Sequence, residues 1–193
     1  MKINHPSERV HSEDQLRQDL IRFIDQPPPV DLPPCPNCVE HLPDDCSPDC
    51  KQAASALSSE PDKYPLEPKV VPIAFELASL RIVETCWSCE GHLDQEGKLW
   101  RMPQVSFYSA SPVYPQLLLR YINKLVYEKR LSYPWHVVLA DFGSTKGVTY
   151  SLEPNLNFVS DPHLGKLQHD LLEVSKGLFL NLKNLAREML SKL

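Results

Sequence analysis

Residues 104–130 read QVSFYSASPVYPQLLLRYINKLVYEKR, a short β-strand pattern followed directly by a helix pattern. Apolar and polar side chains alternate over residues 104–108, as in a strand with one buried face. Ser111 and Pro112 are a helix-start signature, and the leucines and aromatic residues after them recur every three or four positions. This stretch therefore predicts a strand and then an amphipathic helix that ends near Arg130.

Further strand patterns lie on both sides of this stretch. Residues 92–93 and 98–102 surround Gly97, which predicts a hairpin with glycine in its turn. Residues 135–142 and 148–152 predict two more strands, joined by a loop that contains glycine. Because the connections within these pairs are short, we expect a mostly antiparallel sheet.

Two longer segments complete the predicted order of elements. Residues 71–84, with ELASLRIVE at their centre, are interpreted as a strand that has a bulge near Ala78. Asp161 and Pro162 start a helix pattern whose apolar positions continue to Met189 at an average spacing of about 3.6 residues. The resulting order, ββαββα, predicts an α+β fold, a two-layer sandwich with the helices on one face of the sheet.

The N-terminal part of the chain has a different composition. Residues 1–90 contain no glycine, whereas residues 1–73 contain 13 of the 19 prolines. A capping-box pattern and an apolar stripe predict a helix over about residues 12–25, which ends at the three prolines that follow. Residues 27–50 have too few apolar side chains to form a core, so we expect a loop unless a metal ion holds them.

These differences divide the chain near residue 70. Residues 1–70 are expected to contain the first helix, a proline- and cysteine-rich metal-binding strap, and a linker over 58–70. Residues 71–193 are expected to form the α+β core domain, with a zinc-knuckle hairpin over 86–102 and the long terminal helix. About 120 residues are enough for one domain.

Charge and hydropathy exclude several functional classes. The net charge is −5, and residues 1–73 carry 7 basic and 13 acidic side chains, so no basic surface for nucleic acid is expected. No run approaches the roughly 18 apolar residues that a membrane-spanning helix needs. The first residues lack the apolar region of a secretory signal, so we expect a cytoplasmic protein.

All six cysteines lie in three close pairs, in CPNC at 35–38, CSPDC at 46–50 and CWSCEGH at 86–92. In a reducing compartment such pairs are typical of metal ligands rather than disulfides. Two cysteines separated by two residues can bind one tetrahedral zinc ion from a tight turn. The candidate metal ligands are Cys35, Cys38, Cys46, Cys50, Cys86, Cys89 and His92.

The sequence allows one zinc ion or two. The first and third pairs resemble the half-sites of zinc ribbons, which implies one ion held by these four cysteines. Alternatively, the first two pairs hold one ion, and Cys86, Cys89 and His92 hold another. The second ion would then need a fourth ligand from water, His41 or a carboxylate.

The sequence contains patterns of metal ligands but no motif of a known catalytic reaction. We therefore expect an accessory or regulatory protein whose fold is held by zinc, and which binds a partner protein or forms a homodimer through its terminal helix. The first alternative is a small hydrolase-type zinc enzyme, with an open site at Cys86, Cys89 and His92 and Glu84 or Glu90 as base. The second is an iron–sulfur or thiol redox protein.

Overall fold

Four antiparallel strands form the main sheet of the computed structural model, which describes residues 13–28, 66–144, 147–157 and 159–193. Their order is β1-β4-β6-β5, and a separate two-stranded hairpin, β2–β3, is inserted between β1 and β4. The strands are β1 (Val83–Cys89), β2 (His92–Leu93), β3 (Leu99–Arg101), β4 (Gln104–Ser109), β5 (Trp135–Ser144) and β6 (Gly147–Pro154).

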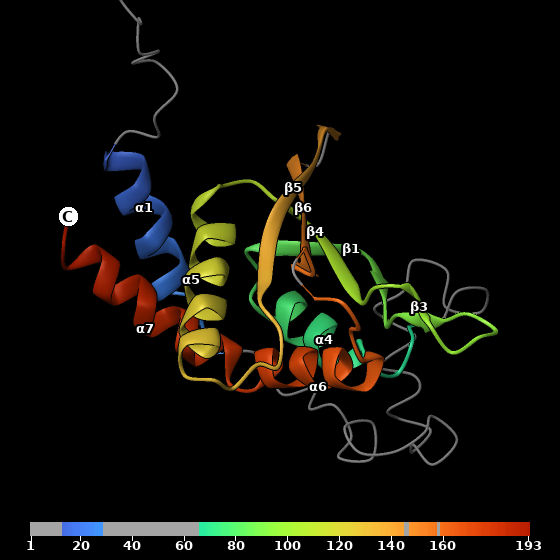
Figure 1. The fold of residues 1–193 in the computed structure, drawn as a ribbon. Coiled ribbons are helices and arrows are strands. Elements are labelled where there is room, and N and C mark those ends of the chain that lie inside the picture. Colours follow the sequence, from blue (N-terminus) through green and yellow to red (C-terminus); the bar gives the residue numbers. More distant parts are fainter. Residues whose placement is uncertain (1–12, 29–65, 145–146, 158) are drawn as a thin grey trace, which may run out of the picture.

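Five helices in the described residues accompany the sheet. The helices gather on one side of it, and the hairpin projects at the end of the molecule opposite to the first and last helices (Figure 1). The helices are α1 (Glu13–Ile24), α4 (Val71–Ser79), α5 (Val113–Tyr127), α6 (Leu164–Ser175) and α7 (Leu178–Leu190).

The core lies between these helices and the inner face of the sheet. Val105 of β4 is the register partner of Leu152 of β6, and both side chains are fully buried, as is Phe107 two residues along β4. Leu117 and Ile122 of α5 are fully buried in the same cluster. Burial of this apolar surface is the main stabilising contribution to the fold.

The predicted α+β class and antiparallel sheet are confirmed, and the arrangement is consistent with two layers. The helix predicted over residues 12–25 is α1, and the pattern of residues 104–130 forms β4 and α5. The hairpin around Gly97 is also present. The order of elements differs from ββαββα in two places, at residues 71–84 and in the terminal helix.

The strand predicted over residues 71–84 is wrong. Val71–Ser79 form α4, and β1 begins only at Val83. Six of the nine α4 residues are buried, so nearly every side of this helix is apolar and the sequence lacks the polar face that identifies a helix. The one-residue slip near Ala78 belongs to the helical period and is not a bulge in a strand.

The terminal helix predicted as one element is divided into α6 and α7. Gly177 lies between them with φ of 65°, in the left-handed region that ends helices and favours glycine. The apolar stripe of α7, including Leu178, Leu182 and Ala186, is buried, and α7 packs mainly against α1 and α5. This part of the stripe packs in the core of the chain itself, and a homodimer through the terminal helix stays a prediction.

Among the described residues, no helix has the length and apolar character needed to cross a bilayer.

Candidate metal centre

Three side chains with metal-binding atoms converge where the hairpin leaves the main sheet. They are Glu67, in the segment before α4, Cys89, the last residue of β1, and His92, the first residue of β2. One ligand atom of each lies within 4.8 Å of the other two. In the described part of the chain, this is the one group of at least three acidic, cysteine or histidine side chains that meets this distance.

Gly91 gives the chain the turn that brings Cys89 and His92 to the same side. Its φ is 83°, a left-handed conformation that side chains disfavour. A Cβ atom at this position would lie 2.7 Å from Leu164 Cδ1 and 2.8 Å from Pro103 Cδ, closer than atoms pack. Glycine is therefore required here by both the backbone conformation and the space.

Backbone amides orient the donor atoms of the group. His92 Nε2 lies 2.9 Å from Glu67 Oε1, and the Glu90 N–H donates to Glu67 Oε2 at 2.6 Å. The Gly91 N–H donates to Cys89 Sγ at 3.4 Å. Outer hydrogen bonds of this kind fix the orientation of metal ligands in proteins, and thiolates benefit from nearby N–H donors.

Glu90 links the site to two neighbouring elements. Its Oε2 accepts a hydrogen bond from the Lys69 N–H at 2.9 Å, and its backbone oxygen accepts one from Gln168 Nε2 at 3.0 Å. The first bond fixes the segment that carries Glu67, and the second attaches the site to α6. The arrangement is thus held from outside by the fold.

Burial and charge raise the pKa of the Cys89 thiol. Cys89 is 3% exposed, and burial raises the pKa of its thiol, with the neighbouring Glu67 carboxylate adding to the increase. The Gly91 N–H and Arg101 lower the pKa of the thiol but do not reverse the shift. A thiol of this kind is a poor nucleophile, because the reactive form is the thiolate.

The three donors could hold a metal ion. Thiolate, imidazole and carboxylate are the common zinc ligands, and zinc bonds to them are about 2.0 to 2.3 Å long. Two such ligands around a tetrahedral ion lie roughly 3.5 Å apart, and the donor atoms of this group lie within 4.8 Å of one another. A bound cation would displace the proton of the Cys89 thiol and would offset the negative charge of Glu67 beside it.

The structure separates Cys86 from this group. Cys86 lies in a bulge of β1, between Thr85 and Trp87, and is exposed, whereas Cys89 is buried. The Cys86–Cys89 pair is therefore in extended strand rather than in the expected knuckle turn. Cys35, Cys38, Cys46, Cys50 and His41 lie outside the described residues.

Glu67 is the member of the group that the sequence did not identify. It lies in Glu-Pro-Lys within the predicted linker, 22 residues before Cys89. No spacing rule connects it to the CWSCEGH motif, and the motif itself indicated only that a carboxylate could complete a site. The approach of Glu67 is a consequence of the tertiary fold.

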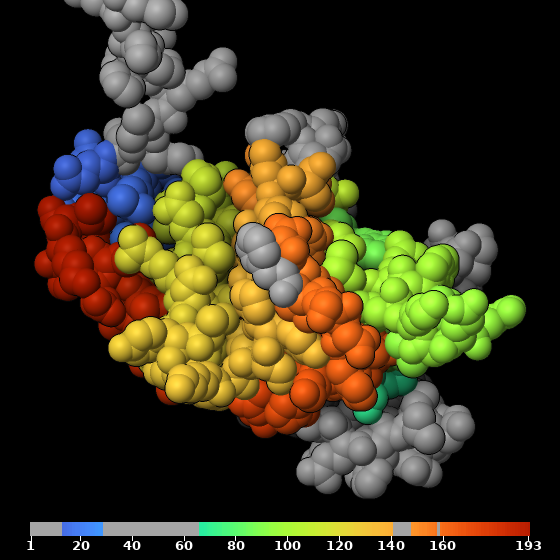
Figure 2. Space-filling model, in the orientation of Figure 1, coloured from blue at the N-terminus to red at the C-terminus, as the bar shows by residue number. Residues whose placement is uncertain are grey.

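Exposed apolar side chains surround the site on the hairpin. The Trp100 side chain is 69% exposed, and its ring centroid lies 6.4 Å from that of His92. The Arg101 guanidinium lies 4.8 Å from the centroid of the Trp87 ring, a cation–π contact. The space-filling view shows the hairpin standing out from the body at one edge (Figure 2). The large exposed apolar residues in this area are Trp87, Leu93, Trp100 and Met102.

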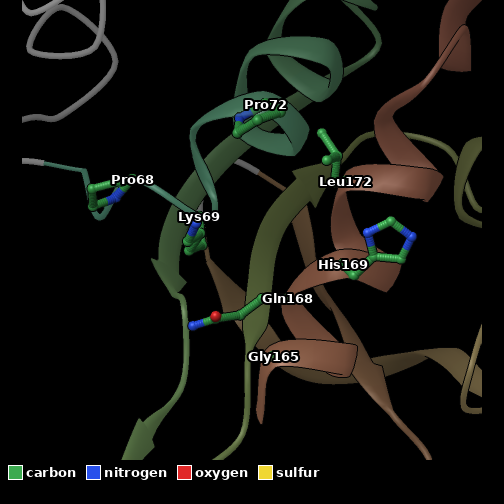
Figure 3. Close-up of a pocket in the computed structure, with 7 residues that line it drawn as sticks. All are labelled: Pro68, Lys69, Pro72, Gly165, Gln168, His169 and Leu172. Atoms are coloured by element: carbon green, nitrogen blue, oxygen red, sulfur yellow. The ribbon is translucent and has the colours of Figure 1, made fainter. Parts of the chain in front are cut away.

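A pocket of about 280 Å³ lies beside the site, between the start of α4 and α6 (Figure 3). Lys69 and Gln168, which both contact Glu90, contribute to its lining, together with apolar walls from Pro72 and Leu172. The full lining is Pro68, Lys69, Pro72, Gly165, Gln168, His169 and Leu172.

Other buried polar groups have structural roles. Asp170 is fully buried and accepts hydrogen bonds from the Ser132 and Tyr133 N–H groups and from Trp135 Nε1. His136 pairs with Glu153 across β5 and β6, at 3.5 Å. These groups have partners within the fold, which accounts for their presence.

Comparison with known proteins gives no relative: no protein-family model, curated protein or solved structure matches the chain.

Proposed function

We propose that the chain is a zinc-binding accessory or regulatory protein that acts by binding another protein, with the ion held by Glu67, Cys89 and His92. The observation that carries the proposal is that donor atoms of three different zinc-binding types lie within 4.8 Å of one another. Backbone N–H groups orient Glu67 and Cys89, and Glu67 pairs with His92. The ion has mainly a structural role, because it joins the segment before α4 to the hairpin.

A fourth coordination position completes the proposed site. Three protein ligands occupy three corners of a tetrahedron, and water or one further cysteine takes the last. Of the cysteine pairs in the sequence, those at 35–38 and 46–50 are available for this position or for a second ion of their own. Metal stoichiometry distinguishes the two arrangements.

The exposed hairpin supports a protein partner. Three large apolar side chains of the hairpin and of the residue after it, Leu93, Trp100 and Met102, are between 41% and 69% exposed, and the Trp100 ring lies next to that of His92. A group of exposed large apolar residues is typical of an interaction surface, and aromatic residues are enriched at such surfaces. The partner is proposed to contact this surface.

A zinc enzyme is the second candidate. It is favoured by a mixed set of three protein ligands, since catalytic zinc sites keep a fourth position for water. Glu90 is the carboxylate nearest in sequence to the ligands, but its Oε2 already accepts the Lys69 N–H. Thiol redox chemistry has less support, because the pKa of Cys89 is raised.

Metal analysis of purified variants tests the proposed ligands. The wild-type protein, prepared without chelators under reducing conditions, is expected to retain about one zinc ion per chain, or two if the N-terminal cysteines hold another. Glu67→Gln should weaken zinc binding at least about tenfold, and Cys89→Ser and His92→Ala by more.

His136→Ala is the matched control, because His136 is also paired with a glutamate at hydrogen-bond range but lies away from the proposed ion. Its zinc content should equal that of the wild type. Metal-free wild-type protein, or equal zinc content in His92→Ala and His136→Ala, would contradict the proposed site. Cys86→Ser should also keep the zinc content of the wild type, because Cys86 is exposed and is not a member of the group.

A further inference from the structure

The hairpin β2–β3 has few connections to the rest of the described structure. Its strands pair only with each other, and Leu99 is its one side chain that packs against the main core cluster. Its side-chain links to the body include the Glu67–His92 pair and the contact of Arg101 with Trp87. The position of the hairpin therefore depends on a small number of contacts at its base.

The candidate metal ligands belong partly to the hairpin and partly to the body of the structure. Glu67 belongs to the segment before α4, which is fixed to the body, whereas His92 is the first residue of the hairpin. Cys89 ends β1, which pairs with β4 of the main sheet. An ion bound to all three would join the hairpin to the body through coordination bonds rather than through one half-exposed ion pair.

The turn of the hairpin is closed by hydrogen bonds of its own. Asp94 Oδ1 accepts hydrogen bonds from the Glu96 and Lys98 N–H groups, and the Asp94 N–H donates to the Lys98 backbone oxygen at 2.8 Å. These bonds close the turn within the hairpin. An ion at the base would therefore change the position of the hairpin as a unit.

The orientation of the Trp100 ring would depend on the orientation of the His92 ring. The two centroids are 6.4 Å apart, and the planes are tilted by 44°. Coordination fixes the imidazole orientation, so the neighbouring indole would lose the alternative positions that a free imidazole permits.

The core is built from residues outside the hairpin, and only the partly buried Leu99 of β3 packs against it. Its buried cluster is formed by side chains of the helices, of β4 to β6 and of the segments that join them, and it contains no residue of β2 or β3. Loss of the ion removes no side chain from this cluster. The helices and the main sheet can accordingly remain folded when the hairpin is free.

We propose that metal occupancy at Glu67, Cys89 and His92 controls the position of the hairpin and of Trp100, while the helices and main sheet stay folded with or without the ion. The inference rests on the proposed zinc site. It assigns that site a regulatory role: the exposed apolar surface of the hairpin is presented in a fixed position only when the metal is bound.

Hydrogen exchange of the full chain, measured with and without zinc, tests the proposal. In the metal-free protein, amides of residues 92–102 should exchange much faster than those of β4 and α5. Some amides exchange only when the hairpin separates from the metal ligands. At a free zinc concentration of one hundred times Kd, the exchange of these amides should slow about a hundredfold. Trp100→Ala should keep the zinc stoichiometry, since Trp100 is not a ligand.

Three outcomes would overturn the proposal. Residues 92–102 could be as protected as the core in the metal-free protein, their exchange could be unchanged by bound zinc, or β4 and α5 could lose protection when zinc is removed. Zinc content is measured on the same samples, so absence of zinc binding is a distinct result that rejects the site itself. Bound zinc without an effect on the hairpin rejects only the regulatory role.

Discussion

Gly91 is the residue whose backbone most directly determines the geometry of the candidate metal centre. It turns the chain between Cys89 and His92 with a φ of 83°, in a space closed by Leu164 and Pro103. The CWSCEGH motif made this glycine visible in the sequence. The structure adds the reason, which is that a side chain here would have both a strained backbone and a steric clash.

Gly91→Ala is expected to destabilise the protein and weaken zinc binding. The left-handed conformation costs about 1 kcal/mol for alanine, and displacement of Leu164 or Pro103 adds about 1 to 3 kcal/mol. Gly97→Ala is the matched control, because Gly97 also has a positive φ, of 78°, but nothing lies within 4 Å of its Cβ position.

Urea unfolding and zinc titration of both variants check this prediction. Gly97→Ala should lose only the conformational contribution and should bind zinc as the wild type does. Equal effects of the two substitutions on zinc affinity would show that the close approach at Gly91 does not shape the site.

Asp170 is a second residue with a large expected contribution to stability. Its buried carboxylate accepts three N–H donors from the segment that leads into β5. Asp170→Asn replaces charge-assisted bonds with weaker ones and turns an amide donor toward N–H groups, so we expect a loss of about 2 to 4 kcal/mol. Chemical denaturation measures the loss, and an unchanged midpoint would contradict this role.

At the scale of elements, Glu173 joins α6 to the end of α5. It pairs with Arg130 at 3.1 Å and with Lys176, the residue that follows α6. The hydrogen bond from Lys176, followed by that from Arg130, lowers the pKa of Glu173. Stability from a lowered carboxyl pKa is present above the unfolded-state value of 4.5 and is lost as the pH falls through the folded-state pKa.

Glu173→Gln should therefore cost roughly 1 kcal/mol at neutral pH and progressively less below pH about 4.5. Unfolding free energies of the wild type and the variant, compared across this range, check the expectation. A difference that stays constant as the carboxyl titrates would contradict the pairing.

The success of sequence-based prediction also differed between elements. Residues 104–130 were predicted correctly because β4 has one buried face and α5 one apolar stripe, so each period is visible. α4 was missed because it is buried on almost every side, and the break at Gly177 was missed because the apolar spacing continues across it. Periodicity reports a boundary between apolar and polar faces, and where that boundary is absent it cannot identify the element.

At the scale of the whole molecule, the fold brings together residues that no local pattern connects. The sequence motif identified Cys89 and His92 as candidate ligands, but the approach of Glu67 depends on α4 packing beside β1 and α6. The same packing places the site at the edge of the core rather than within it. Removal of the ion should accordingly alter the hairpin more than the global fold.

The most direct test of the account is the X-ray absorption spectrum of bound zinc in the wild-type protein and in Cys89→Ser. The wild type should show sulfur at about 2.3 Å together with nitrogen and oxygen at about 2.0 to 2.2 Å. Cys89→Ser should lose one sulfur neighbour or the ion itself. Zinc bound in the wild type without a sulfur ligand, or an identical spectrum in Cys89→Ser, would contradict a metal centre at Glu67, Cys89 and His92.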